Sequence, residues 1–290
     1  MIWDLILQQT ANGIAHGMSL ALIALGLTMV FGVLHVINFA HGELYMVGGL
    51  ALVVGMTALH FNYPLALVLA ILVAGIVAWL VDEVGVRPVL DQKDGHSPVL
   101  LTTFAISMLL NQGVLAVWGP SPVRVSGFTG ITEFGSVVIT NQRWFVIGAG
   151  LFVLVLIELI LRRTRIGKDI RAIASSAYAA KVVGINVRRV RTITFVAAGA
   201  LAGFTGAVMV PITTFNPTIG HNIIVDAFVV VVVGGMGNAF GAVVCGLLVG
   251  LLQAYLSIVM PQQIGIAVVY GLLLLTLLVR PQGLMGGRRA

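Results

Sequence analysis

Four polar side chains lie close together at residues 35–43, between two long apolar stretches of the chain. The segment reads His-Val-Ile-Asn-Phe-Ala-His-Gly-Glu, which places Asn38, His41 and Glu43 where an ordinary loop has little room. Ionisable groups inside apolar segments are costly in lipid and are therefore candidates for function. A helix broken here would present backbone groups and these side chains to a polar solute on a translocation pathway. The residues leave one alternative open, a short interfacial turn in which Asn38 and Glu43 cap the next helix.

A second irregular segment divides a long apolar run near the C-terminus. Residues 234–241 read Gly-Gly-Met-Gly-Asn-Ala-Phe-Gly, and four glycines in eight residues predict a sharp change of backbone direction. Asn238 and the glycine-aromatic pattern around it resemble residues 38–42. We therefore expect the two segments to be equivalent broken helices of two inverted repeats, with Asn238 also on the pathway.

Motifs for enzyme chemistry are missing from the sequence. The only fragment near a phosphate-binding loop, residues 166–169, lacks the first glycine and the hydroxyl residue of that motif. His35 and His41 are six residues apart and do not share a helical face as two metal ligands would. We predict no catalytic, metal or cofactor site on this chain. Asp226 is expected in the N-terminal turn of a helix near the outer face.

The elements that position these residues must be membrane helices. Of the 290 residues 59% are hydrophobic and 9% charged, against roughly 25% charged in soluble domains. The mean hydropathy is +1.08. Since Cys245 is the single cysteine, a disulfide scaffold is excluded. The composition predicts an integral membrane protein.

The apolar stretches predict an all-α transmembrane bundle of eight or nine spans with discontinuous helices, forming one domain over residues 1–290. The number depends on whether residues 35–43 are a loop or a break within the membrane. The candidate spans are residues 13–34, 38–59, 64–81, 97–118, 144–161, 192–210, 222–236, 240–259 and 264–279. The unbroken valine run at 229–233 is typical of a buried strand in water, but lipid leaves an open strand unsatisfied, so we expect a helix.

Glycine pairs within these spans predict close helix packing. Small residues four apart let helix backbones approach each other in lipid. Such pairs occur at Gly13 and Gly17, Gly199 and Gly203, Gly237 and Gly241, and Gly246 and Gly250.

The basic residues predict the orientation of the chain. The net charge is +6, and nine of the sixteen Lys and Arg residues lie at 162–191, with a single acid. The positive-inside rule places this segment in the cytoplasm. The same rule places Arg87 and Lys93 inside, and it makes the C-terminus with Arg280, Arg288 and Arg289 cytoplasmic. Because the charge is explained by topology, we expect membrane lipid and no nucleic acid as a partner. The side of the N-terminus stays open.

The cytoplasmic segment, about 162–191, contains a predicted helix at 169–183. Alanines are frequent in it, and Gly184 provides a C-terminal stop. It is too short and too polar to cross a bilayer. The face that carries alanine and isoleucine must pack against another surface. A groove of a partner protein and an anionic lipid surface fit it equally well on physical grounds.

Three blocks of the sequence resemble one known family. Residues 26–43, Gly-Leu-Thr-Met-Val-Phe-Gly-Val-Leu-His-Val-Ile-Asn-Phe-Ala-His-Gly-Glu, resemble the N-terminal signature of branched-chain amino acid ABC-importer permeases. Residues 167–186 are similar to the cytoplasmic coupling segment of these permeases, and residues 234–241 match their third recurring block. The length of 290 residues resembles the shorter of the two permease subunits, which usually pairs with a longer homologue.

The resemblance implies a permease in a bacterial inner membrane that accepts an amino acid from a periplasmic binding protein. Two cytoplasmic ATPase subunits would use the ATP, which explains the missing phosphate loop. A second, homologous permease subunit would complete a heterodimer. The helix at 168–186 would sit in a groove of one ATPase. The coupling residues implied by the match are Gly167, Arg171, Ala172, Ala177, Ala180 and Gly184.

The substrate is less fixed than the mechanism. Permeases of this type also serve urea, short amides and other small zwitterions. The alternative reading is a stand-alone secondary transporter or channel for a small polar solute such as urea or an amide.

Overall fold

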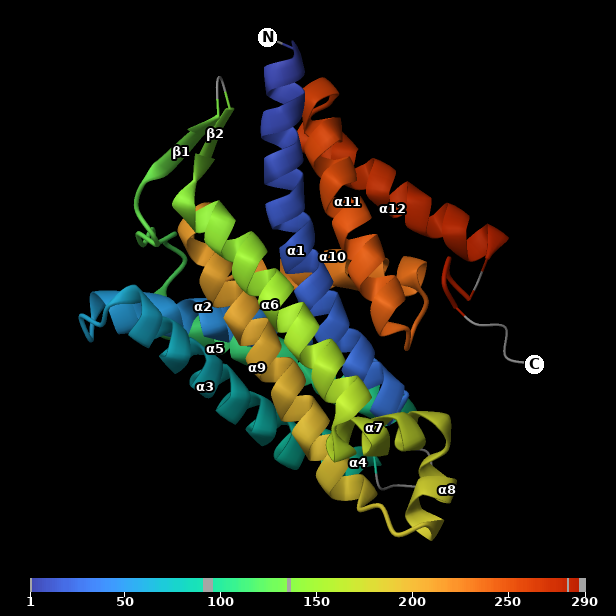
Figure 1. Cartoon of the computed structure of the whole chain (residues 1–290). Coiled ribbons are helices and arrows are strands. Elements are labelled where there is room, and N and C mark those ends of the chain that lie inside the picture. Colours follow the sequence, from blue (N-terminus) through green and yellow to red (C-terminus); the bar gives the residue numbers. More distant parts are fainter. Residues whose placement is uncertain (1, 91–95, 135–136, 281, 287–290) are drawn as a thin grey trace.

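The computed structural model describes residues 2–90, 96–134, 137–280 and 282–286 as a mostly helical molecule (Figure 1). Lys93, Arg288 and Arg289, which the charge argument also uses, lie outside the described residues. The helices that form the bundle are α1 (Ile2–Leu34), α2 (His41–Thr57), α3 (Tyr63–Val81), α5 (His96–Trp118), α6 (Asn141–Arg163), α9 (Val187–Thr213), α10 (Ile219–Gly234), α11 (Ala239–Val259) and α12 (Gln262–Val279). Shorter elements are a π-helix η1 (Asp82–Val86) and the helices α4 (Arg87–Leu90), α7 (Arg165–Ser175) and α8 (Ala177–Val182).

Each of the nine predicted apolar stretches overlaps one of these bundle helices, but residues 38–40 and 58–59 lie outside α2, and residues 235–236 lie outside α10. Six of the described helices are long and apolar enough to cross a membrane, namely those of α1, α3, α5, α6, α9 and α11. The chain is therefore a multi-pass helical membrane protein by length and composition. The count of eight or nine spans is not confirmed, because the other three bundle helices are shorter than the roughly 20 residues of a full crossing: α2 has 17 residues, α10 has 16 and α12 has 18.

The expectation of an all-α chain missed a small hairpin. Strands β1 (Ile131–Phe134) and β2 (Val137–Thr140) pair antiparallel, with Ile131 opposite Thr140. They lie in the connection between α5 and α6, beside the N-terminal end of α1 (Figure 1). β-branched residues, which suit strands, are concentrated here, and the connection lies outside the apolar spans that the sequence argument treated.

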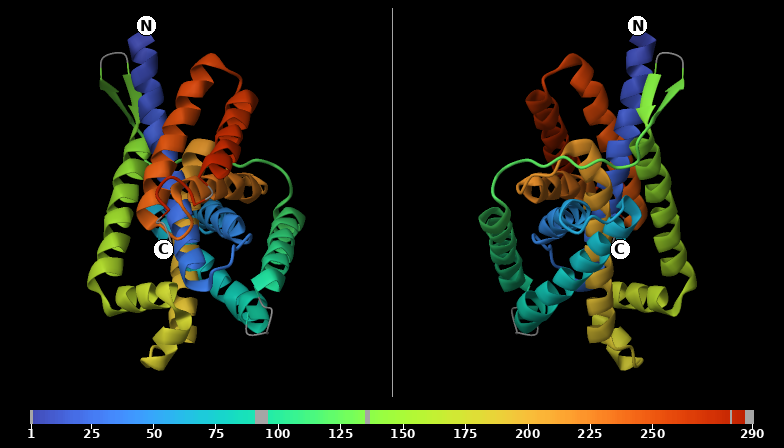
Figure 2. Two further views of the ribbon diagram at one scale, coloured as in Figure 1. Left: turned by 90° about the vertical axis from the view of Figure 1, so that its right-hand side faces the viewer. Right: turned by 90° about the vertical axis from the view of Figure 1, so that its left-hand side faces the viewer.

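Two groups of helices form the core and run in opposite directions. In Figure 1, α1 and α3 descend whereas α9 and α11 rise, so that α1 packs antiparallel along α11 and α3 along α9. The short helices α2 and α10 contact each other and lie inside the molecule in both views of Figure 2. α7 and α8 lie at the end of the bundle opposite the N-terminus and the hairpin.

Glycine pairs hold the two long crossings together. A methyl group at Gly246 would lie 2.6 Å from the Ala21 Cα, and one at Gly17 would lie 2.9 Å from the Leu247 Cα, so α1 and α11 touch through their backbones. At the crossing of α9 and α3, a methyl group at Gly203 would lie 2.2 Å from the Ala74 Cβ, so a small side chain packs directly against the glycine. Close packing at these pairs is confirmed. The prediction of close packing is wrong for the pair at 237 and 241. Gly237 lies in a turn with a φ of +86°, and a methyl group added there would have no atom within 4 Å.

Candidate functional site

The break at residues 35–40 is confirmed as a change of direction between two helices. α1 ends at Leu34, His35 has a φ of 55°, and α2 begins at His41. Asn38 is 3% exposed and His41 is fully buried. The His41 Nε2 lies 3.2 Å from the carbonyl oxygen of Ile23, which ties the start of α2 back to α1. Val36, Asn38 and Ala40 of this segment are buried, whereas His35 and Phe39 are exposed.

In the alternative interpretation, the side chain of Asn38 or Glu43 caps α2. The structure shows no side-chain hydrogen bond that caps this helix, whose N-cap residue is Ala40. The Asn38 Oδ1 instead accepts a hydrogen bond from the Ala40 N–H at 3.0 Å. The buried atoms Asn38 Nδ2 and His41 Nδ1 have no hydrogen-bond partner among the described residues. Buried polar groups are rarely left unsatisfied, so these two atoms make the start of α2 a candidate functional site.

Glu43 stands where three helices meet. It is 2% exposed in the first turn of α2, and its Oε1 accepts a hydrogen bond from the Ser107 hydroxyl of α5 at 3.2 Å. One turn further along α5, the Asn111 Nδ2 donates to the carbonyl oxygen of Pro217 at 2.8 Å, just before α10. The backbones of α2 and α10 touch at Gly42 and Gly220. Glu43 is thus a buried polar group at the crossing of the two short helices.

Asn238 lies apart from this crossing. It stands beyond the far end of α10, whose 16 residues extend about 24 Å, and its Oδ1 caps α11 by accepting from the Gly241 N–H at 3.0 Å. Its Nδ2 donates to the carbonyl oxygen of Met285 at 2.7 Å. The sharp turn at residues 234–241 is confirmed, with a φ of +100° at Gly235. The predicted equivalence of this turn with residues 38–42 is not confirmed. The helix α2 contacts the start of α10, and α10 follows a different break at residues 214–218.

Polar residues of four helices meet in a cleft that the sequence argument missed. This cleft, which we call the α1–α11 cleft, has a volume of about 400 Å³ and is lined by residues of α1, α9, α10, α11 and α12. The His16 Nε2 lies 2.9 Å from the Gln253 Oε1. The Tyr270 hydroxyl donates to the Asp226 Oδ1 at 3.3 Å. Asp226 is the eighth residue of α10, so the expectation that it occupies the first turn of a helix is wrong.

A signal for this cleft was present in the sequence. Gln9, Asn12 and His16 line one side of it, and their spacings of three and four residues place them on one face of α1. Gln253 and Ser257 on α11 are four apart and also line it. Because these polar residues are spread over helices that are mostly apolar, the mean hydropathy of each span hides them.

The basic segment forms two helices and not one. The predicted helix at 169–183 is wrong in extent: α7 begins at Arg165, and Ser176, with a φ of −160°, separates it from α8. The Thr164 Oγ1 caps α7 by accepting from the Gly167 N–H at 3.1 Å, and the Ser176 Oγ caps α8. Hydroxyl side chains at helix starts compete with continuous helix and explain the interruption.

The implied coupling residues divide into those that face the bundle and those that face outward. Gly167 and Ala180 are buried, while Ala172 and Ala177 pack against the core, so these four hold the segment on the bundle. Arg171 is exposed, and its guanidinium donates to the carbonyl of Leu161 in α6. Gly184 is exposed with a φ of +88°, which glycine adopts without strain.

The outward face of α8 carries residues that the motif did not single out. Tyr178 is 82% exposed, Val182 70% and Val183 74%. Large apolar side chains this exposed outside the long apolar helices form a patch that requires cover. These three residues are more exposed than the alanines of the motif, so a protein that docked here would contact them first.

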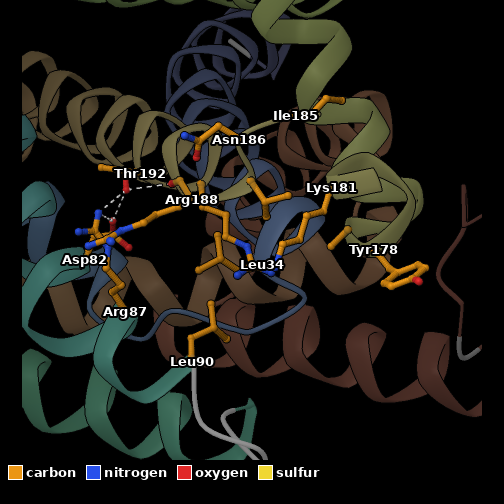
Figure 3. Close-up of a pocket in the computed structure, with 13 residues that line it drawn as sticks. Leu34, Asp82, Arg87, Leu90, Tyr178, Lys181, Ile185, Asn186, Arg188 and Thr192 are labelled. Carbon is orange, nitrogen blue, oxygen red and sulfur yellow. Dashed lines mark hydrogen bonds and ion pairs between the residues drawn. The ribbon is translucent and has the colours of Figure 1, made fainter. Parts of the chain in front are cut away.

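A pocket of about 560 Å³ lies between α8, the start of α9 and the segment formed by η1 and α4 (Figure 3). On one wall the Thr192 Oγ1 donates to the Asp82 Oδ2 at 2.8 Å and accepts from the Arg87 Nη2 at 2.7 Å. Arg87 also pairs with Glu83, and the Arg188 Nη2 lies 3.8 Å from the Glu83 Oε1. These bonds join the segment after α3 to the start of α9, so two segments predicted to be cytoplasmic lie together at one end of the molecule.

Comparisons with known proteins identify relatives along nearly the whole chain. A family described as the permease component of branched-chain amino acid transport systems matches residues 9–278. The chain is 32% identical to the high-affinity branched-chain amino acid transport system permease protein LivH of Escherichia coli, over 97% of this chain and 95% of LivH. It is 31% identical to LivH of Salmonella typhimurium and to BraD of Pseudomonas aeruginosa, both over the same shares.

Proposed function

The chain belongs to the family of branched-chain amino acid transport permeases, and from this premise we propose that it carries branched-chain or related amino acids across a bacterial inner membrane. The family membership confirms the sequence-based prediction of a transport subunit that is not an enzyme. The names of the relatives, high-affinity branched-chain amino acid permeases matched over 95% of their length, carry the substrate assignment. The solute would come from a periplasmic binding protein.

We propose that residues 1–290 form one transmembrane domain with nine helical segments, of which α2 and α10 cross only part of the membrane. With the N-terminus outside, this count puts Arg87, residues 162–191 and the C-terminus in the cytoplasm, and Arg124 outside. The hydrogen bond from Arg87 to Thr192 supports this arrangement, because it keeps two basic segments at one end. The positive-inside rule then assigns that end to the cytoplasm.

The repeated helix pattern supports an inverted repeat. Each proposed unit has a long helix, a break, a short helix and a second long helix: α1–α3 in one direction and α9–α11 in the other (Figure 1). The breaks carry His35 with a φ of 55° and Thr214 with a φ of 70°. Inverted repeats with discontinuous helices at their interface are the usual frame for alternating access. In this frame α2 and α10 are the equivalent short helices.

We infer that the crossing of α2 and α10 belongs to the translocation pathway. Asn38, His41 and Glu43 support this by their burial and by their unsatisfied atoms at the start of α2. Polar groups buried at this depth are energetically costly, so a rearrangement that exposes them to water or to solute is favourable. Asn238 would act separately, at the turn that ends α10, where it holds the C-terminal tail through Met285.

The energy for transport would come from ATP bound by two cytoplasmic ATPase subunits, one of which docks on α7 and α8. Gly167, Ala172, Ala177 and Ala180 would fix these helices on the bundle, while Arg171 and Gly184 would lie at the contact. The exposed residues Tyr178, Val182 and Val183 support this site, since an apolar helix face fits a groove. Closure of the ATPases then favours one bundle arrangement by contacting it differently from the other. A second, homologous permease subunit would complete the channel.

Co-purification tests this docking site. We expect the ATPase to co-purify with the intact protein and to be lost when Arg171, which lies at the proposed contact, is changed to Asp. Tyr178→Asp alone should weaken it at least tenfold, because it places a charge in a desolvated contact. Ile131→Asp, at a residue 57% exposed on the hairpin, is the matched control and should retain the ATPase. Equal recovery with all variants would contradict docking at α7 and α8.

A further inference from the structure

The α1–α11 cleft concentrates hydrogen-bonding groups where the surrounding helices are apolar. Its lining includes Asn12 and His16 from α1, Asp226 from α10 and Gln253 from α11. These helices are otherwise apolar enough to cross a membrane or to lie within it. A cluster of amide, imidazole and carboxylate groups there is costly unless it serves a solute. The cluster is separate from the crossing at Glu43 and from the basic segment.

The charges of the cleft favour a solute with a cationic group. Asp226 is its one carboxylate, and its lining contains no Lys or Arg. The Tyr270 hydroxyl donates to the Asp226 Oδ1 at 3.3 Å, and the carboxylate also interacts with the Gln253 amide and the His16 imidazole. On α1 the Asn12 Oδ1 is buried and has no hydrogen-bond partner in the described part of the chain. The cleft therefore offers acceptors from α1 and α10 without a Lys or Arg side chain beside them.

The remaining wall suits an aliphatic group. Ala254, Ile266 and Gly265 line it, and neither glycine nor alanine fills the space beside the polar groups. A volume of about 400 Å³ leaves room for a small amino acid, whereas ligand sites for larger molecules reach about 1,000 Å³. The adjoining crossing of Gly17 with α11 is backbone on backbone, so the position of Asn12 relative to Gln253 is set by packing.

We propose that the α1–α11 cleft binds the transported solute and that Asp226, with Asn12, receives the α-ammonium group of an aliphatic amino acid. This inference rests on the proposed function and names the chemical class that its pathway selects. The cleft lies in the half of the molecule nearer the N-terminus of α1, so in the proposed orientation it receives solute from the outer side. Charge-assisted hydrogen bonds to an ammonium are about twice as strong as neutral ones, and they discriminate against amides that lack the charge.

The test uses the whole complex, with its ATPases and its binding protein, in proteoliposomes. ATP-dependent uptake of leucine is measured together with the ATP hydrolysis that the loaded binding protein stimulates. Asp226→Asn should lower the leucine moved per ATP at least tenfold, with hydrolysis within twofold of the wild-type rate. Asp226→Glu should retain uptake within threefold, because it keeps the carboxylate. Glu158→Gln, at an exposed acid of α6 that lines neither the cleft nor the proposed docking helices, is the matched control and should change neither quantity.

The outcomes separate this inference from the function on which it rests. Uptake per ATP within twofold of wild type in Asp226→Asn would overturn the inference and leave the importer intact. A wild-type complex that moves urea or short amides but no amino acid would refute the substrate class of the proposed function together with this inference. Failure of the wild-type complex to move any solute with ATP would refute the proposed function itself. If Asp226→Asn does not assemble, Asn12→Leu gives the same test, and unchanged uptake by that variant would equally overturn the inference.

Discussion

The crossing of the two short helices has no spare space, and a single methyl group should disturb it. A Cβ added at Gly220 would lie 2.6 Å from the Gly42 carbonyl oxygen and 2.8 Å from the Glu43 Oε2. Real Cβ atoms essentially never approach another atom within 3.0 Å, so α2 and α10 must separate by at least 0.4 Å, the difference between 3.0 and 2.6 Å. The nearer atom is backbone and cannot rotate away. Gly220→Ala is therefore an overpacking change at the proposed pathway.

Overpacking of this kind costs about 1–3 kcal/mol. For chains of this size a loss of 1 kcal/mol lowers the unfolding midpoint by about 2–4 °C, so Gly220→Ala should lower it by about 2–12 °C. Gly148→Ala in α6 is the matched control, because nothing lies within 4 Å of the added methyl group. Alanine is the better helix former by up to about 1 kcal/mol, so the control should keep or raise the midpoint.

The assay is thermal unfolding of the purified protein in one detergent, followed by the loss of the monodisperse peak in gel filtration. The two variants are compared with the parent in the same experiment. Equal midpoints for Gly220→Ala and Gly148→Ala would refute the close contact of α2 and α10. A loss confined to Gly148→Ala would contradict the reasoning still more strongly.

Two further substitutions test the buried polar groups. Glu43→Leu removes the acceptor of the Ser107 hydroxyl and should lower solute uptake at least tenfold while the complex still assembles; normal uptake would show that the break is only a turn. Arg87→Leu leaves Asp82, which is 3% exposed, without its ion pair and should lower the free energy of unfolding by about 3 kcal/mol, measured by denaturant titration. Arg162→Leu breaks an exposed pair with Glu158 and should cost less than about 1 kcal/mol; a larger loss there than at Arg87 would contradict the assignment.

The membrane helices were predictable because lipid leaves the chain few choices. Backbone groups without water must bond within their own segment, so even the valine run at 229–233 is helical, as part of α10. The packing of Gly246 against Ala21 was predictable for the same reason, since small residues decide contact when apolar surface is everywhere. In lipid, the residue types of a segment therefore predict both its helical structure and the places where two helices come into close contact.

The pairing of the breaks was not predictable from local pattern. Asn238 resembles Asn38 in its neighbours, yet α2 meets α10 at Gly220, after a break that shares little with residues 35–40. The correspondence depends on the order and direction of whole helices. A short motif does not encode that order.

The outward face of the basic segment and the α1–α11 cleft were also beyond the sequence argument. The motif at 167–184 selects alanines that the bundle needs for contact, whereas Tyr178 is left exposed and carries no pattern of its own. In the cleft, Asp226 lies beside residues of helices that are more than 200 positions away, such as His16. Side chains so far apart in sequence come together only when the bundle closes.

ATP dependence of uptake tests the central claim most directly. The chain is reconstituted into vesicles with its second permease subunit and ATPases, the leucine-loaded binding protein is added on the periplasmic side, and accumulated leucine is measured with ATP or with a non-hydrolysable analogue. We predict accumulation against a gradient with ATP and none with the analogue. Leucine transport by the chain in vesicles that contain no ATPase would contradict the account and favour a stand-alone transporter or channel.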